Sequence, residues 1–315
     1  MESATGTVFL RNVIGEYMTA LGDKSEKVVM VNADLMGTCR NSGFVQKYPE
    51  RSFNVGIAEQ NLVSFAAGLA HEGFTPYVFS MSPFLTMRAC EQCRTDVAYG
   101  HLNVRLIGTY AGGSGGISGA THWALEDCSI MTGIPGMTVL EPSDGTQAQK
   151  MLDATLDFDG PVYIRSSVEP TCKIYHENTP YTIGEASIPV EGDDGSFICS
   201  GITVKYAIQA AQKIRENSGY HIRVIDMHTI KPLDRQAVIS AAKTGRIVVA
   251  QDHNVVGGLG YSVAAVLAEE GISVPFVNLG FPDRFVSMAH APYLYHQFGY
   301  DDIGLEKKMT ELLQP

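Results

Sequence analysis

Residues 53–60 read FNVGIAEQ, from Phe53 to Gln60, and this stretch decides the fold. A short strand runs into the turn residue Gly56, and Glu59 follows in the first turn of an apolar helix. A carboxylate at such a junction can be partly desolvated. Its pKa would then rise and it could exchange a proton with a bound heterocycle. The alternative is that Glu59 only complements the helix dipole, which contributes about 0.3–1 kcal/mol.

The same strand–helix alternation extends through the first half of the chain. Apolar runs predict strands at 28–31, 53–55, 75–79, 104–109, 138–140 and 161–165. Helical patterns lie between them, at 8–21, from Glu59 to Ala70, and at 84–99, 122–131 and 142–156. Repeated β-α units require a parallel sheet covered on both faces.

Residues 168–195 lack periodicity and are rich in Pro, Gly and acidic residues, which predicts a linker. Beyond it, strands are expected at 197–200, 222–225, 247–250 and 274–277, with helices at 203–217, 234–243 and 260–270. The sequence therefore predicts an α/β protein with two doubly wound domains in series. Their bounds are 1–170 and 196–315, joined by 171–195.

Composition excludes several classes of protein. The chain has 315 residues, 45% hydrophobic and 18% charged, which suits a globular protein with a large core. A formal net charge of -11 argues against a nucleic-acid or anionic-membrane surface. No run of about 18 apolar residues and no signal-peptide pattern occurs, so we expect a cytoplasmic protein.

The six cysteines are scattered, which favours reduced thiols. Cys90 and Cys93 form a lone C-x-x-C on an expected helix, where a packing role is more common than a redox centre. The Gly257-Gly258-Leu259-Gly260 run resembles a dinucleotide motif, but Val263 stands at the third glycine position. A tight turn is the better interpretation.

Four features fall at the carboxyl ends of the expected strands, where ligands of such sheets bind. They are Asp34, Glu59, the loop after Thr109, and Arg165. The loop holds five glycines within 112–119, so its backbone can approach a ligand, but it lacks the lysine of a P-loop.

Two side chains near these strand ends admit a functional and a structural interpretation. His122 follows the loop at an expected helix start, where a neutral acid/base histidine is plausible and a structural one is more common. The planar guanidinium of Arg165 could bind a phosphate or carboxylate through two hydrogen bonds, or form an ordinary salt bridge.

Together these motifs resemble the transketolase and 1-deoxyxylulose-5-phosphate synthase family, in order and over nearly the whole chain. The resemblance is carried by Asn32 to Leu35, Val55 to Asn61, Phe65 to Ala70, Gly119 to His122, Glu141 to Asp144, Ile230 to Asp234 and Asp252 to Gly260. It implies a pyrimidine-binding domain for thiamine diphosphate followed by a transketolase C-terminal domain.

The resemblance also implies roles for individual residues. Glu59 would hydrogen-bond the pyrimidine N1′ of thiamine diphosphate and so promote loss of the thiazolium C2 proton. Phe84 resembles the phenylalanine that stacks on the aminopyrimidine, although the helix after it is one residue longer than in relatives. His122 would polarise or relay protons at substrate oxygens. Arg165 and Thr38 would hold the substrate's terminal anion, and Asp34 would support the cofactor pocket.

Two positions depart from the transketolase pattern. Ser118 stands where transketolases place an acid that contacts sugar hydroxyls, which leaves the choice of sugar open. Tyr110 stands where they usually carry a phosphate-contacting histidine, which leaves open both how the substrate's anion is held and whether it is a sugar phosphate.

The sequence lacks the Gly-Asp-Gly motif through which the family holds the diphosphate and Mg²⁺. We therefore expect no metal ligands on this chain. A separate N-terminal subunit would supply them, in an α2β2 heterotetramer with active sites between the subunits. The reaction would move a two-carbon ketol unit from a ketose to an aldose.

Three alternatives remain open. The β subunit of a 2-oxoacid dehydrogenase E1 component shares the fold and the glutamate, but differs around Thr121-His122. A deoxyxylulose-phosphate synthase is close in motif, but normally carries both halves in one chain. An inactive scaffold would keep the fold without turnover, which the retained Glu59 and His122 argue against.

Overall fold

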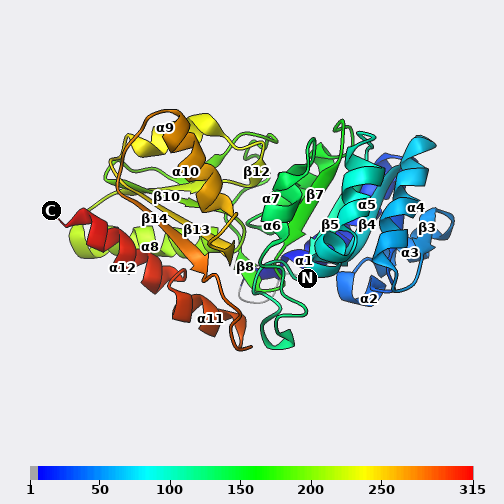
Figure 1. Cartoon of the computed structure of the whole chain (residues 1–315), viewed down its shortest axis with the longest axis horizontal. Helices are drawn as coiled ribbons and strands as arrows, with labels where there is room; N and C mark the ends of the chain where they lie inside the picture. Colours follow the sequence, from blue (N-terminus) through cyan, green and yellow to red (C-terminus); the bar gives the residue numbers. More distant parts are fainter. Residues whose placement is uncertain (1–5, 315) are drawn as a thin grey trace.

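The computed structural model describes residues 6–314, which form two α/β halves lying side by side (Figure 1). The first half is built on a seven-stranded sheet of order β12-β6-β7-β5-β4-β2-β3. Its strands are parallel, except that β12 runs antiparallel to β6. Their bounds are β2 (Val28–Asn32), β3 (Ser52–Asn54), β4 (Thr75–Met81), β5 (Arg105–Thr109), β6 (Thr138–Leu140), β7 (Val162–Ser166) and β12 (Thr229–Lys231).

Helices cover both faces of this sheet. One face packs on α1 (Leu10–Lys24) and α7 (Gly145–Ala154), and the other on α4 (Glu59–His71) and α6 (Asp127–Gly133). Successive strand residues point to opposite faces. Tyr77 and Phe79 accordingly join one core cluster, while Val78 joins the other. The short helices α2 (Met36–Cys39) and α3 (Ser42–Lys47) and a 3₁₀ turn (Pro49–Arg51) connect β2 to β3.

The second half has a five-stranded sheet of order β14-β13-β10-β11-β9. Its strands are β9 (Ser187–Val190), β10 (Gly195–Cys199), β11 (Ile222–Asp226), β13 (Ile247–Asn254) and β14 (Phe276–Phe281), with β9 antiparallel to β11 and the rest parallel. Its helices are α8 (Thr203–Ser218), α9 (Arg235–Ala242), α10 (Leu259–Glu269), α11 (Ala291–Phe298) and α12 (Asp302–Leu313).

The segment expected as a linker contains secondary structure of its own. Within it, β8 (Pro170–Cys172) pairs with β1 (Thr7–Phe9), and β9 forms an edge of the second sheet. The second half also returns β12 to the edge of the first sheet. These strands have three or four residues each, too few to show a period in the sequence.

The helix expected at 84–99 is broken into three pieces. Two π-helical segments, Phe84–Arg88 and Cys93–Ala98, flank the short helix α5 (Cys90–Gln92). A π turn is the usual way to accommodate one extra residue in a helix. In this segment Cys93 is buried, which raises its thiol pKa, and its Sγ lies 3.7 Å from the Leu85 carbonyl oxygen. Burial of this thiol favours packing over redox chemistry for the C-x-x-C.

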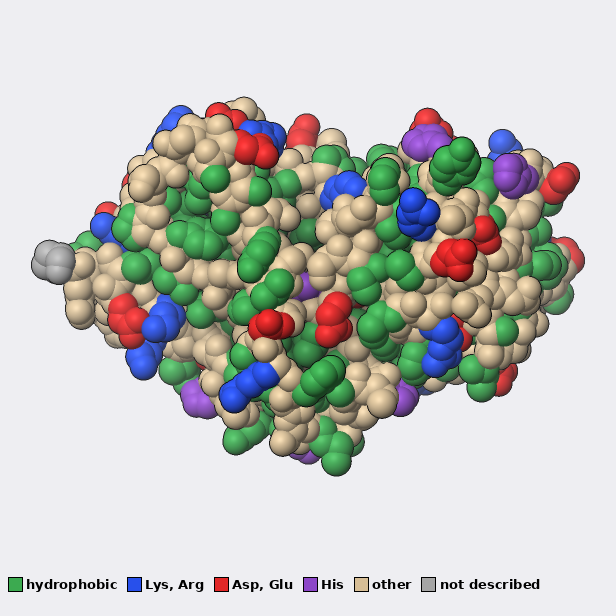
Figure 2. Space-filling view, viewed as in Figure 1, with side chains coloured by type: hydrophobic (Ala, Val, Ile, Leu, Met, Phe, Trp, Pro, Cys, Tyr) green, Lys and Arg blue, Asp and Glu red, His purple; other side chains and the backbone are tan. Residues whose placement is uncertain are grey.

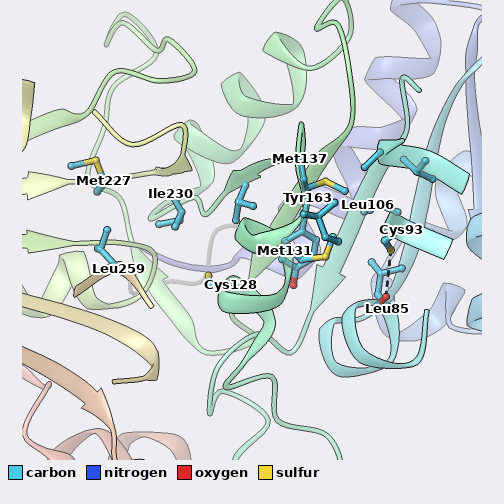
Figure 3. Packing of buried hydrophobic residues seen from close by; sticks show 14 of the residues in the cluster. Leu85, Cys93, Leu106, Cys128, Met131, Met137, Tyr163, Met227, Ile230 and Leu259 are labelled. Carbon is cyan, nitrogen blue, oxygen red and sulfur yellow. Dashed lines mark hydrogen bonds between the residues drawn. The ribbon is translucent and has the colours of Figure 1, made fainter. Parts of the chain in front are cut away.

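One hydrophobic cluster runs from the first half into the second, as Figure 3 shows. Leu85 and Cys93 lie at one end, Met131 of α6 in the middle, and Met227 and Leu259 at the other end. Continuous apolar burial between the sheets joins the two halves, in addition to the partly exposed segment that connects them in sequence.

The surface mixes side chains of both charges with scattered hydrophobic ones on the face seen in Figure 2. Within residues 6–314, every helix is too short or too polar to cross a bilayer.

Candidate active site

Glu59 begins α4 and is almost completely buried, with 1% of its surface exposed. The chain reaches it from β3 through Gly56, whose φ of 76° requires the left-handed region that favours glycine. Its carboxylate accepts a 2.6 Å hydrogen bond from Arg88 Nη1 at Oε2. Ser80 Oγ lies 3.5 Å from Oε1. A buried acid therefore sits at the junction that the sequence predicted.

Phe84 and His122 lie on the same side of the site as Glu59, linked to it through Arg88. The guanidinium carbon of Arg88 is 4.4 Å from the centroid of the Phe84 ring. The Phe84 and His122 rings meet edge to face at 5.3 Å. The structure thus brings together the three residues proposed for cofactor and proton chemistry, and it adds Arg88, which sequence reasoning missed.

His122 does not begin a helix, contrary to expectation. It lies in a turn, and α6 starts only at Asp127. An isolated bridge between Gly112 and Ala124 draws this segment onto the glycine loop, and the buried Trp123 donates from Nε1 to the Gly116 carbonyl at 3.0 Å. Because α6 begins five residues after His122, the His122 ring does not lie at a helix N-terminus. Its Nδ1 lies 2.9 Å from Thr121 Oγ1.

The glycine loop is held by the second half of the chain. Asp252 of β13 accepts a 2.9 Å hydrogen bond from the Gly113 amide. A Cβ at Gly112 would lie 2.3 Å from the Asp252 carboxylate, and one at Gly113 2.4 Å from the Phe281 ring. Side chains at these two positions would clash with Asp252 and Phe281 and displace the loop from them. Ser118, on the same loop, is exposed.

Asp34 and Thr38 follow β2 at the same edge of the sheet. Asp34 has a left-handed φ of 59°, and its amide donates to Asn54 Oδ1 at 2.9 Å. Asn54 Nδ2 in turn donates to Asp34 Oδ1 at 3.2 Å. This reciprocal pair ties the end of β2 to the end of β3. Thr38 is half-buried in α2.

Tyr110 is paired with an arginine that sequence reasoning also missed. Arg11 of α1 donates from Nη1 to the Tyr110 hydroxyl at 3.1 Å, and its Nε is buried with no hydrogen-bond partner among residues 6–314. No carboxylate of the described residues pairs with Arg11. A half-buried cation facing only a neutral phenol is suited to receive an anion.

Arg165 is placed differently from the expectation. It is fully buried, and it donates to both oxygens of Asp127 at 2.8 and 3.1 Å and to Glu141 Oε1 at 2.6 Å. It also donates to the Asp252 carbonyl oxygen at 3.0 Å. Every guanidinium nitrogen is thus used inside the protein, because the second half covers the end of β7. The salt-bridge interpretation replaces the anion-binding one.

Ligand atoms of Asp127, Cys128 and His253 lie within 4.8 Å of one another, a spacing compatible with a metal. Both Asp127 oxygens, however, accept from Arg165. The adjacent guanidinium disfavours a second cation, so the arrangement is better explained as an ion-pair network.

Comparison with known proteins identifies the family. A model described as the transketolase pyrimidine-binding domain matches residues 7–172, and one described as the transketolase C-terminal domain matches residues 184–304. The chain belongs to the transketolase family.

Named relatives agree with this family assignment. The chain is 39% identical over 292 residues to a 6-deoxy-6-sulfo-D-fructose transketolase subunit of a Clostridium species, covering 92% of this chain and 90% of the relative. It is 38% identical to a 1-deoxy-D-xylulose-5-phosphate synthase of Geobacter sulfurreducens, covering 96% of this chain but only 48% of that protein.

A solved structure titled as an inactive β4 tetramer of a split-gene transketolase superposes with a TM-score of 0.87 at 33% identity. The match covers 97% of this chain and 98% of that one. This transketolase chain therefore corresponds in extent to a split subunit and to about half of the single-chain synthase.

Proposed function

We propose that this chain is the C-terminal subunit of a two-subunit transketolase that moves a two-carbon ketol unit from a ketose to an aldose. The observation that carries the proposal is the buried carboxylate of Glu59 beside the Phe84 ring, with His122 against that ring's edge. A hydrogen-bond acceptor next to an aromatic ring fits the aminopyrimidine of thiamine diphosphate. Asp34 would support this pocket through its pair with Asn54.

When bound, thiamine diphosphate supplies an electron sink for the two-carbon unit. Glu59 would hold a proton at the pyrimidine N1′, and its burial keeps that proton from exchanging with solvent. His122 would transfer protons at the substrate oxygens, with Thr121 orienting its ring. Ser118 would contact a sugar hydroxyl from the exposed side of the loop.

The substrate's anionic end would be held by Arg11, with Thr38 and Tyr110 beside it. Thr38 belongs to α2, which contacts α1, the helix that carries Arg11. Arg11 would thus take the role that the sequence gave to Arg165. A relative named for a sulfo-fructose substrate is consistent with a phosphate or a sulfonate at this position.

The diphosphate and Mg²⁺ would be held by an N-terminal partner that carries Gly-Asp-Gly, in an α2β2 heterotetramer of the cytoplasm. Three large hydrophobic residues flank the site, with exposures of 76% at Ile57, 45% at Met87 and 64% at Ile117. Exposed apolar side chains around a functional site are typical of a surface that another subunit covers.

The test is reconstitution with thiamine diphosphate and Mg²⁺. The chain alone should show no ketol transfer, and addition of the Gly-Asp-Gly subunit should restore it. Glu59→Gln should lower kcat of the complex about 10²–10⁴-fold without preventing assembly. Full activity of the isolated chain, or nearly unchanged activity of the Glu59 variant, would refute the proposal.

A synthase activity is the second candidate, because the synthase relative is 38% identical. The reconstituted complex should therefore also be supplied with pyruvate and an aldose phosphate. Turnover of pyruvate without turnover of a ketose donor would favour the synthase or the 2-oxoacid dehydrogenase alternative.

A further inference from the structure

Arg88 makes two contacts at the centre of the site. Its Nη1 donates to Glu59 Oε2 at 2.6 Å, and its guanidinium carbon lies 4.4 Å from the centroid of the Phe84 ring. The two partners of the ion pair differ sharply in environment. The Arg88 side chain is 47% exposed and that of Glu59 only 1%. A flexible arm thus reaches from the solvent edge to a buried acid.

These are the contacts that the proposed function gives to the aminopyrimidine ring. A guanidinium is planar, carries N–H donors in its plane, and stacks on aromatic rings. It therefore offers Glu59 a donor and Phe84 a flat partner, as an aminopyrimidine protonated at N1′ does. Two such groups cannot use the same carboxylate oxygen and the same ring face together.

We propose that Arg88 competes with the cofactor's aminopyrimidine for Glu59 and Phe84, so that cofactor binding requires the guanidinium to swing toward solvent. The inference rests on the proposed function. Leaving a buried carboxylate without a partner is costly, so Arg88 keeps Glu59 compensated until another donor replaces it.

The local structure allows this exchange. Among residues 6–314, Glu59 is the hydrogen-bond partner of the Arg88 side chain, so a swing outward breaks one ion pair and one stacking contact. Arg88 ends the π-helical segment that Phe84 begins. In this π-helical segment the Arg88 guanidinium lies over the Phe84 ring.

The experiment measures thiamine diphosphate binding to the assembled complex by calorimetry at saturating Mg²⁺. Arg88→Met removes the charge and the donors but keeps the length of the side chain. It should lower the Kd about tenfold, because the free site loses its competing ion pair. Arg88→Lys keeps the charge without the flat group, and it should lie between Arg88→Met and the wild type. If Arg88→Met assembles poorly with the partner subunit, the Kd of Arg88→Lys provides the test.

The matched control is Arg235→Met. Arg235 of α9 has a side chain that is 44% exposed, and it pairs with Glu269 and Glu270 at the end of α10, far along the chain from Glu59. Its replacement should leave the Kd unchanged. A double-mutant cycle with Glu59→Gln tests whether the change in Kd comes from the Arg88–Glu59 pair. Arg88→Met should no longer lower the Kd when residue 59 is neutral.

An unchanged or higher Kd for Arg88→Met would overturn the competition, and so would a gain that persists in the Glu59→Gln background. Failure of the proposed function gives a different result, in which the wild-type complex shows no saturable binding of thiamine diphosphate.

Discussion

Replacing Arg165 by methionine tests the buried network between the two halves of the chain. The variant removes hydrogen bonds to Asp127, Glu141 and the Asp252 carbonyl, all inside the protein. Asp127 and Glu141 are 1% and 3% exposed, so their charges would remain buried without a cation. Removing one partner of a buried ion pair typically costs about 3–5 kcal/mol, and we expect a loss of unfolding free energy in that range.

Hydrogen bonds from residues other than Arg165 limit the loss of unfolding free energy. Tyr163 donates to Asp127 at 2.7 Å, and Ser200 and Gln251 donate to Glu141 at 2.7 and 3.0 Å. These bonds survive the substitution and keep both carboxylates partly satisfied.

The assay is urea unfolding followed by the fluorescence of Trp123. It is the only tryptophan of the sequence, and it is 2% exposed beside the glycine loop. Arg165→Lys keeps a charge without the fork and should lose less, while the exposed Arg235→Met should change stability by less than about 1 kcal/mol. A loss below about 1 kcal/mol for Arg165→Met, together with a raised KM for an anionic sugar, would refute the structural role and restore the anion-binding one.

Two further predictions concern titration and substrate binding. Burial raises the pKa of Asp226 to about 7, against hydrogen bonds from Ser143, Gln147 and Tyr175 that lower it. The folded state then keeps a proton that the unfolded state releases near pH 4, so this group's contribution to stability falls as the pH rises from about 4 to 7, by about 1.4 kcal/mol per unit of pKa difference. Asp226→Asn cannot titrate, so its urea-unfolding free energy relative to wild type should increase across that range, and a constant difference would contradict this. Arg11→Met should raise KM for an anionic ketose about 10- to 100-fold with a smaller effect on kcat, because a charge-assisted contact is worth about 1.5–3 kcal/mol. The measurement is steady-state kinetics of the complex with charged and uncharged ketose donors. If Arg11 does not bind the anion, Arg11→Met should change KM equally for both donors.

The sequence was informative wherever an apolar run was long enough to be buried. β2 and β5 lie close to their expected ranges, because five buried residues between turn signals leave little alternative. Strands β8, β9 and β12 were missed. Each pairs antiparallel with a strand from a distant segment, outside the regular alternation of parallel strands and helices, and that neighbour stabilises it. No local pattern carries that information.

The site was predictable in part for a similar reason. Glu59 could be placed because a strand, a glycine and a helix surround it in sequence. Arg165 could not be assigned, because its partners Asp127, Glu141 and Asp252 come from three other segments. Arg88 lay within a helix that the pattern predicted as regular, and its π-helical geometry gave no signal.

The second half of the chain contributes to the site by holding the glycine loop of the first half. One carboxylate oxygen of Asp252 accepts a hydrogen bond from the Gly113 amide. The Tyr295 and Tyr300 hydroxyls donate to the same carboxylate at 2.9 and 3.1 Å. The glycine loop is thus fixed to the C-terminal sheet at its start, ahead of the turn that carries His122. Glu59 and Phe84, by contrast, belong to elements of the first sheet. In the proposed reaction, His122 would therefore depend on the C-terminal half for its position, whereas Glu59 would depend on the first sheet.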